Sequence, residues 1–110
     1  MPHIRVRGMA FEDLEYISAS LIKSLAKYLD LPASHFTLEY QNVTYLAAEG
    51  ASKAYPFFEV LCFKRSDEVK AGMAKLITEL VKANIEPELD ICVLFQTMAS
   101  DDYYYHSGQS

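Results

Sequence analysis

Alternating apolar and polar residues predict a short strand at the start of the chain. Apolar side chains stand at the even positions from Pro2 to Val6, whereas the odd positions are polar. This period of two is typical of a strand with one buried face. The polar side of the strand carries His3, Arg5 and Arg7.

A longer period follows and predicts an amphipathic helix from Phe11 to Leu29. Its apolar residues recur every three or four positions, which places them in one stripe along a helix. These residues are Leu14, Ile17, Leu21, Leu25 and Leu29. Leu31-Pro32 ends the helix, because the residue before a proline is pushed out of the helical region. A second strand is then expected from about Phe36 to Leu46.

The same order of elements returns in the second half of the chain. After a loop at Glu49–Ser52, the pattern predicts a strand, a helix and a strand. Their expected bounds are Tyr55 to Phe63, Asp67 to Ala83 and Leu89 to Phe95. A shift of 55 residues places Pro32 on Pro87, so that a proline follows each helix.

The predicted fold class is α+β, with two tandem β-α-β units in one four-stranded sheet and both helices on one face. A helix long enough to cross over makes the two strands of each unit parallel, with a right-handed connection. We expect a single domain over residues 1–110, since one core typically serves about 100–150 residues. Its repeated units are 1–47 and 55–97, and residues 98–110 form a C-terminal tail.

The face of the sheet away from the helices is expected to carry ionisable side chains from every strand. They are Arg5, Arg7, Glu39, Glu59 and Asp90. Because ionised groups in a dry core cost several kcal/mol each, this face is predicted to be solvated with cross-strand ion pairs, or to close around a polar cavity. Leu61 and Leu94 share the face, so it is also a candidate surface for burial against another subunit.

Composition and charge exclude several classes of protein. The chain has 10 basic and 15 acidic residues, so it has no broad positive field to attract nucleic acid or anionic lipid. No apolar run reaches the roughly 20 residues that span a bilayer, and the N-terminus has no apolar signal core. The sequence therefore predicts a cytoplasmic protein with no nucleic-acid or membrane partner.

Neither a metal nor a cofactor is predicted. Cys62 and Cys92 lie in apolar runs without CxxC spacing, so we expect buried free thiols. His3, His35 and His106 are too dispersed to indicate a metal site. No glycine-rich phosphate-binding motif occurs in the sequence.

Four features together resemble the tautomerase superfamily, which includes macrophage migration inhibitory factor. They are Met1-Pro2 leading directly into a strand, the doubled β-α-β unit, the loop Leu46–Ser52, and an aromatic tail with Tyr103–His106. The tail is otherwise expected to pack on a partner as an extra strand. The likeness is to an uncharacterised bacterial branch of the superfamily, a domain of unknown function. It implies a homotrimer.

The resemblance also implies a chemistry. In tautomerases the initiator methionine is removed, and the free proline amine moves a proton between carbon and oxygen of an enol or keto acid. Pro2 is therefore the expected base, and an ordinary α-amino group, with a pKa of about 7.7–8.0, needs little tuning for this task. Arg5 and Arg7 are predicted to bind the carboxylate of a small anionic substrate. Glu39 and Glu59 are further substrate-site candidates, as an acid-base pair or as partners of the arginines.

Departures from the inhibitory-factor pattern leave other interpretations open. Leu31 replaces a lysine after the first helix, and Cys92 and Leu94 replace a tyrosine and an asparagine in the last core strand. While Met1 is attached, the Pro2 nitrogen is an amide, and Pro2 is then only a strand-initiating proline. The alternatives are a noncatalytic oligomeric module of the same fold and a ferredoxin-like small-molecule-binding domain. Parallel pairing of the first and second strands favours the tautomerase fold, and a first strand beside the third favours the ferredoxin-like one.

Overall fold

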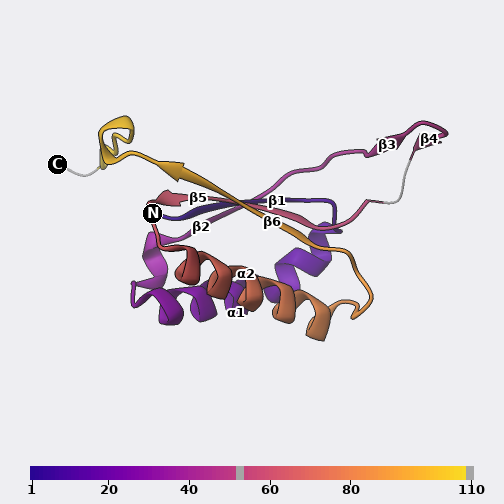
Figure 1. The fold of residues 1–110 in the computed structure, drawn as a ribbon, viewed down its shortest axis with the longest axis horizontal. Coiled ribbons are helices and arrows are strands. Elements are labelled where there is room, and N and C mark those ends of the chain that lie inside the picture. Colours follow the sequence, from indigo (N-terminus) through magenta and orange to yellow (C-terminus); the bar gives the residue numbers. More distant parts are fainter. Residues whose placement is uncertain (52–53, 109–110) are drawn as a thin grey trace.

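The computed structural model of the protein describes residues 1–51 and 54–108. Its main elements form two consecutive β-α-β units (Figure 1). The first unit contains β1 (His3–Arg7), α1 (Phe11–Leu29) and β2 (Thr37–Tyr40). The second contains β5 (Phe57–Phe63), α2 (Asp67–Asn84) and β6 (Cys92–Met98). A hairpin of two short strands, β3 (Leu46–Ala47) and β4 (Gly50–Ala51), lies between the units.

The four longer strands form one mixed sheet in the order β2-β1-β5-β6. β1 pairs with β2 in parallel, β5 pairs with β6 in parallel, and β1 pairs with β5 in antiparallel orientation. The first strand is therefore beside both the second and the third of the main strands. Its direct parallel pairing with β2 decides the fold, because a ferredoxin-like sheet splits the β-α-β unit with another strand.

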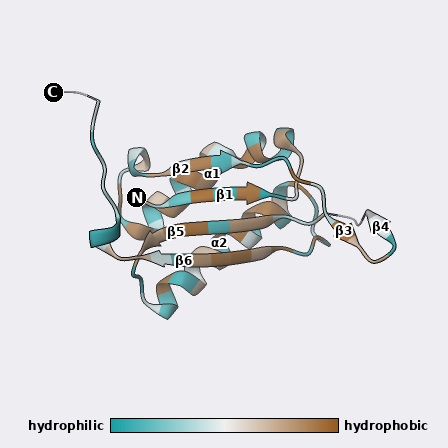
Figure 2. Ribbon diagram, turned by 90° about the horizontal axis from the view of Figure 1, so that it is seen from above, coloured by the Kyte–Doolittle hydropathy of each residue, from teal (hydrophilic) through white to brown (hydrophobic). Residues whose placement is uncertain are grey.

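Both helices cover one face of the sheet, and the core lies between the helices and the strands (Figures 1 and 2). The predicted α+β architecture is confirmed. Buried strand residues are Ile4, Val6, Phe58, Val60 and Cys62. Buried helix residues are Leu14, Ile17, Leu21, Leu25 and Ala26 of α1, with Met73, Ile77 and Val81 of α2. The stripe predicted for α1 is thus the side that faces the sheet, with Leu29 partly buried at its end.

The helix boundaries follow from local chemistry. Glu12 and Asp13 lie in the first turn of α1, where the helix dipole favours negative charge. The helix ends at Asp30, which adopts a left-handed backbone conformation with a φ of 55°. α2 begins after Ser66, whose hydroxyl accepts a hydrogen bond from the Val69 amide. Both helices begin where the sequence pattern predicts.

β2 is shorter than the sequence pattern predicts. It ends at Tyr40 instead of Leu46. The last backbone bond along this edge runs from the Gln41 amide to the Val6 carbonyl, at 2.8 Å. β1 ends one residue later, at Arg7, so a longer β2 would have no strand to pair with.

β6 is displaced toward the C-terminus relative to the prediction. It begins level with the first residue of β5, because Cys92 pairs with Phe57, and it continues to Met98. Asp90 therefore precedes the strand, and the prediction that it lies on the polar face of the sheet is wrong. On the sheet face away from the helices, Leu94 of β6 pairs with Glu59 of β5.

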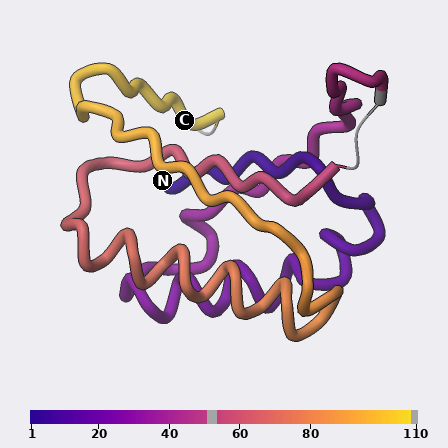
Figure 3. Tube along the Cα trace, turned by 45° about the vertical axis from the view of Figure 1, so that its right-hand side comes forward, coloured from indigo at the N-terminus to yellow at the C-terminus, as the bar shows by residue number. Residues whose placement is uncertain are grey.

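Two segments extend beyond the sheet at opposite ends of the molecule (Figure 3). The β3–β4 hairpin lies at one end. At the other, a short 3-10 helix (Ser100–Asp102) follows β6 and leads into residues 103–108, which form no strand. Among the described residues, no helix is long and apolar enough to cross a membrane.

Candidate active site

Pro2 lies immediately before β1 and is held in place by the fold. Its ring is buried, as are the side chains of Ile4 and Val6 on the same side of the strand. Its carbonyl accepts a hydrogen bond from the Thr37 amide at 3.2 Å. Because Met1 is attached, the Pro2 nitrogen is an amide, and it becomes a basic secondary amine only when Met1 is removed.

A cavity of about 630 Å³ opens at the start of β1. Four parts of the chain that are distant in sequence line it: the N-terminus, the segment leading into β2, the end of β5 and the C-terminal segment. The lining residues are Met1, His3, Ser34, His35, Thr37, Phe63, Tyr103 and Tyr105. The rings of Phe63 and Tyr103 meet edge to face, with their centroids 5.5 Å apart. The rings of Phe63 and Tyr103 therefore form an aromatic wall of the cavity, and its other lining residues include imidazole and hydroxyl groups.

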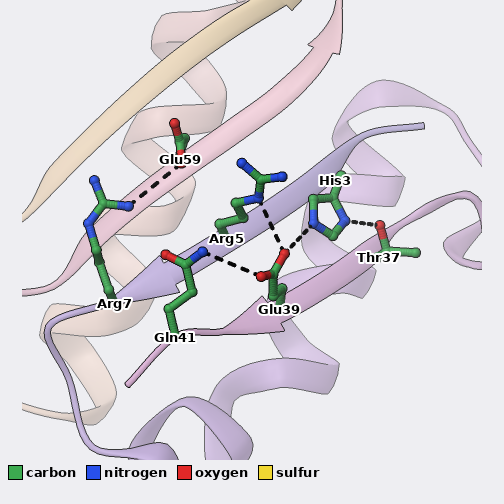
Figure 4. Close-up of polar contacts among 7 residues, drawn as sticks. All are labelled: His3, Arg5, Arg7, Thr37, Glu39, Gln41 and Glu59. Carbon is green, nitrogen blue, oxygen red and sulfur yellow. Dashed lines mark hydrogen bonds and ion pairs between the residues drawn. The ribbon is translucent and has the colours of Figure 1, made fainter. Parts of the chain in front are cut away.

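His3 links the cavity to the polar face of the sheet (Figure 4). Its Nδ1 atom is hydrogen-bonded to the Thr37 hydroxyl, and its Nε2 atom lies 2.8 Å from Oε1 of Glu39. The parallel register of β1 and β2 produces this arrangement, because it places His3 opposite Thr37 and Arg5 opposite Glu39. Both ring nitrogens of His3 are thus engaged by groups of the neighbouring strand.

Glu39 receives three side-chain donors. They are His3, Arg5 at 3.3 Å and Gln41 at 3.4 Å (Figure 4). The hydrogen bond from His3 is the main cause that holds the pKa of the Glu39 carboxyl below its ordinary value, and Gln41 and Arg5 act in the same direction. An ionised carboxylate can only accept hydrogen bonds. Nε2 of His3 must therefore carry the proton that lies between His3 and Glu39.

The two arginines predicted to bind an anion are paired within the sheet. Arg5 lies beside Glu39, and Nη1 of Arg7 lies 3.6 Å from the Glu59 carboxylate. The Arg7 guanidinium also covers the ring of Phe57, 4.1 Å from its centroid. The geometry thus shows the predicted cross-strand ion pairs. Neither arginine is among the described residues that line the cavity, and anion binding by them stays a prediction.

The sequence pattern does not single out most residues around the cavity. Two of the five predicted site residues adjoin it through a neighbour: Pro2 through Met1, and Glu39 through His3. The histidines attract notice only as metal ligands, and the tyrosine-rich tail only as a surface for a partner. The sequence does contain one signal that could have found His3 and Thr37. They precede Arg5 and Glu39 by two positions on adjacent strands, and residues two apart on a strand share a face of the sheet.

The chain matches one protein family and several solved structures. The family described as a domain of unknown function, DUF1904, matches residues 1–110. No curated protein sequence matches the chain significantly. A DUF1904 domain from Sebaldella termitidis has a solved structure that is 32% identical, with a TM-score of 0.87, covering 96% of this chain and 95% of that one.

More distant structures share the fold. The macrophage migration inhibitory factor-like protein of Entamoeba histolytica is 16% identical, with a TM-score of 0.73, over 96% of this chain and 95% of that one. A fused 4-OT asymmetric trimer is 14% identical, with a TM-score of 0.77, over 94% of this chain and 91% of that one. The chain therefore belongs to the DUF1904 family of unknown function and has the fold of the tautomerase and macrophage migration inhibitory factor superfamily.

Proposed function

We propose that the protein, once Met1 is removed, is a tautomerase-like enzyme with the Pro2 nitrogen as its base. It moves a proton between carbon and oxygen of a small keto or enol substrate that carries a carboxylate. The observation that carries this proposal is the position of Met1, which lines the cavity at the start of β1. Removing Met1 enlarges the cavity and turns the adjoining Pro2 amide into an amine.

The surroundings of Pro2 suit a positioned base. Its ring is fixed by burial, and its carbonyl accepts a backbone hydrogen bond from Thr37, so the nitrogen is held in place beside the sheet. A base that is held in one position avoids the entropy cost of finding its substrate atom. Proton transfer by such a positioned group typically accelerates a reaction by about 10²–10⁴-fold.

Of the two predicted anion-binding arginines, Arg5 is the better candidate for the substrate carboxylate. It shares the Glu39 carboxylate with His3, which lines the cavity. Its side chain is 39% exposed, against 27% for Arg7, which is both ion-paired and stacked on Phe57. Glu59 then serves as the partner of Arg7 rather than as a substrate ligand.

The proposal includes a homotrimer. No element of the described residues covers the sheet face away from the helices (Figure 1), and this face mixes ion pairs with apolar side chains such as Leu94, which is 42% exposed. Such a mixed face is suited to burial against other subunits. One protein of the same fold, the fused 4-OT, forms an asymmetric trimer.

The test uses untagged protein whose intact mass shows whether Met1 is absent. Keto-enol conversion of phenylpyruvate is followed in the wild type, in Pro2→Ala and in Pro56→Ala. Pro56 is the matched control, because it occupies the equivalent place before β5, is equally buried, and accepts a backbone bond from Cys92. We expect Pro2→Ala to lower kcat at least about 100-fold and Pro56→Ala to retain activity.

Two outcomes would overturn the proposed function. Protein from its native source that retains Met1 has no free Pro2 amine and cannot use this base. Turnover that is absent, or equal in wild type and Pro2→Ala, would equally exclude Pro2 catalysis. Retained Met1, or a processed protein without turnover, favours the noncatalytic oligomeric module.

A further inference from the structure

We propose that Thr37 and His3 form the second proton-transfer group of the site, delivering a proton to the substrate oxygen while Pro2 acts at carbon. This inference rests on the proposed function and adds to it the group that acts on the oxygen. It is carried by the hydrogen-bonded series Thr37, His3, Glu39 at the wall of the cavity.

The geometry makes Thr37 the group that meets the substrate. Both Thr37 and His3 line the cavity, and Thr37 is exposed. The two ring nitrogens of His3 are already occupied, one by the Thr37 hydroxyl and the other by Glu39. A proton held on the imidazole therefore reaches a bound molecule through the Thr37 oxygen. A threonine hydroxyl can donate one proton and accept another at the same time, so it is able to pass a proton on.

In the keto-to-enol direction, protons move at both the carbon and the oxygen of the substrate. The neutral Pro2 amine takes a proton from the carbon next to the carbonyl, the C–H electron pair forms the C=C bond, and the carbonyl π electrons move to oxygen. That oxygen takes the hydroxyl proton of Thr37, and Thr37 takes the Nδ1 proton of a protonated His3. His3 ends neutral, with its remaining proton on Nε2 and hydrogen-bonded to Glu39, and the Pro2 ammonium returns its proton to Nδ1 of His3 through solvent.

A carboxylate faces the imidazole ring of His3. Glu39 presents Oε1 to Nε2 of His3, while Arg5 donates to the same oxygen and Gln41 donates to Oε2. The other titratable side chains among the described lining residues are His35, at the end of a short 3-10 helix (Ala33–His35) before β2, and Tyr103 and Tyr105, from the C-terminal segment. Glu39 is the one described carboxylate in contact with the imidazole, so it is the group that balances an imidazolium charge.

The experiment compares three variants in Met1-free protein with phenylpyruvate as the probe. Thr37→Val removes the hydroxyl while keeping the shape of a β-branched residue, and Thr37→Ser keeps the hydroxyl. Thr97→Val is the matched control, since it makes the same substitution on β6 at a residue that is not among those lining the cavity. We expect Thr37→Val to lower kcat at least about 100-fold with KM changed less than about threefold. Thr37→Ser is expected to stay within about fivefold of wild type.

The outcomes separate this inference from the proposed function. Loss of kcat in both Pro2→Ala and Thr37→Val, with rescue by Thr37→Ser, supports both. Activity that requires Pro2 but is unchanged in Thr37→Val overturns the Thr37–His3 relay alone. A processed wild type without turnover overturns both.

A further variant tests His3 if Thr37→Val unfolds, as judged by thermal melting. His3→Gln keeps an amide that can bond Glu39 but cannot carry the relayed proton. It is expected to lower kcat at least about 100-fold, and unchanged kcat in a folded His3→Gln protein contradicts the relay.

Discussion

At the scale of single residues, Glu39 holds the polar side of the site together. It accepts from an imidazole, a guanidinium and an amide of three different residues. Removing such an acceptor leaves all three donors to find water instead, which they can do only in part because they are half-buried. The conformation of His3 therefore depends on a residue that does not line the cavity.

The lowered pKa of Glu39 predicts how the free energy of unfolding changes with pH. A carboxyl whose folded pKa lies below its unfolded value adds stability above the unfolded value, which is lost as pH falls through the folded one. The stability gap between wild type and Glu39→Gln should therefore be present at pH 7 and shrink as pH falls below the ordinary value of 4.5. Urea unfolding at pH 7, 5 and 3 measures it.

Glu49→Gln is the control for that measurement, because Glu49 is exposed in the turn of the β3–β4 hairpin. The free energy of unfolding of Glu49→Gln should equal that of the wild type at all three pH values. A gap for Glu39→Gln that persists unchanged at pH 3 would show that the contacts of its carboxylate do not stabilise the fold.

At the scale of elements, Gly8 sets how β1 passes into α1. Its φ is 86°, in the left-handed region, and a Cβ at this position would lie 1.9 Å from the carbonyl oxygen of Tyr55. Gly8→Ala should therefore destabilise the protein by about 2 kcal/mol or more, combining backbone strain with a steric clash against backbone. Chemical denaturation measures the loss.

Gly108→Ala supplies the matched control for Gly8→Ala. Apart from its neighbours in the chain, no described residue has an atom within 4 Å of the Cβ that it would add. Its unfolding curve should overlay that of the wild type, and a Gly8→Ala protein that does the same would contradict the described approach of the two loops.

The helices are predicted closely from sequence because their determinants are local. The apolar stripe of α1, its acidic first turn and the stop before Pro32 all lie within the segment itself. The ends of β2 and β6 depend instead on where a neighbouring strand begins and stops. No pattern within residues 36–46 or 89–95 contains that information, and so both strands are misplaced by several residues.

The site depends on pairing even more strongly. Pro2 can be singled out from its place in the sequence, whereas the contact of His3 with Glu39 requires β1 and β2 to be parallel in one register. A slip of one residue would turn Glu39 to the other face of the sheet. The aromatic wall is less predictable still, because the tail returns to Phe63 through a turn that the sequence pattern does not indicate.

At the scale of the whole molecule, the uncovered sheet face makes a prediction about assembly. If copies of the chain bury this face, Leu94→Arg places a charge in the interface and should separate the subunits. Light scattering should then give about the 12.5 kDa of one chain, against three times that mass for wild type. Tyr16→Arg is the control, because Tyr16 is 73% exposed on α1, in the layer beyond the other face of the sheet.

The control should keep the wild-type mass. A wild type that already has the mass of one chain would exclude the proposed trimer. A Leu94→Arg protein that remains trimeric would place the interface elsewhere.

The burial of Pro2 has a consequence for timing. An aminopeptidase must draw the first residues of a chain into its own active site as an extended segment, but in the folded protein the Pro2 ring is inside the core and its carbonyl is bonded to Thr37. If the proposed processing takes place, Met1 therefore has to leave before β2, which is made later, pairs with β1. Whether a molecule then carries a free proline amine depends on the relative rates of processing and folding during synthesis.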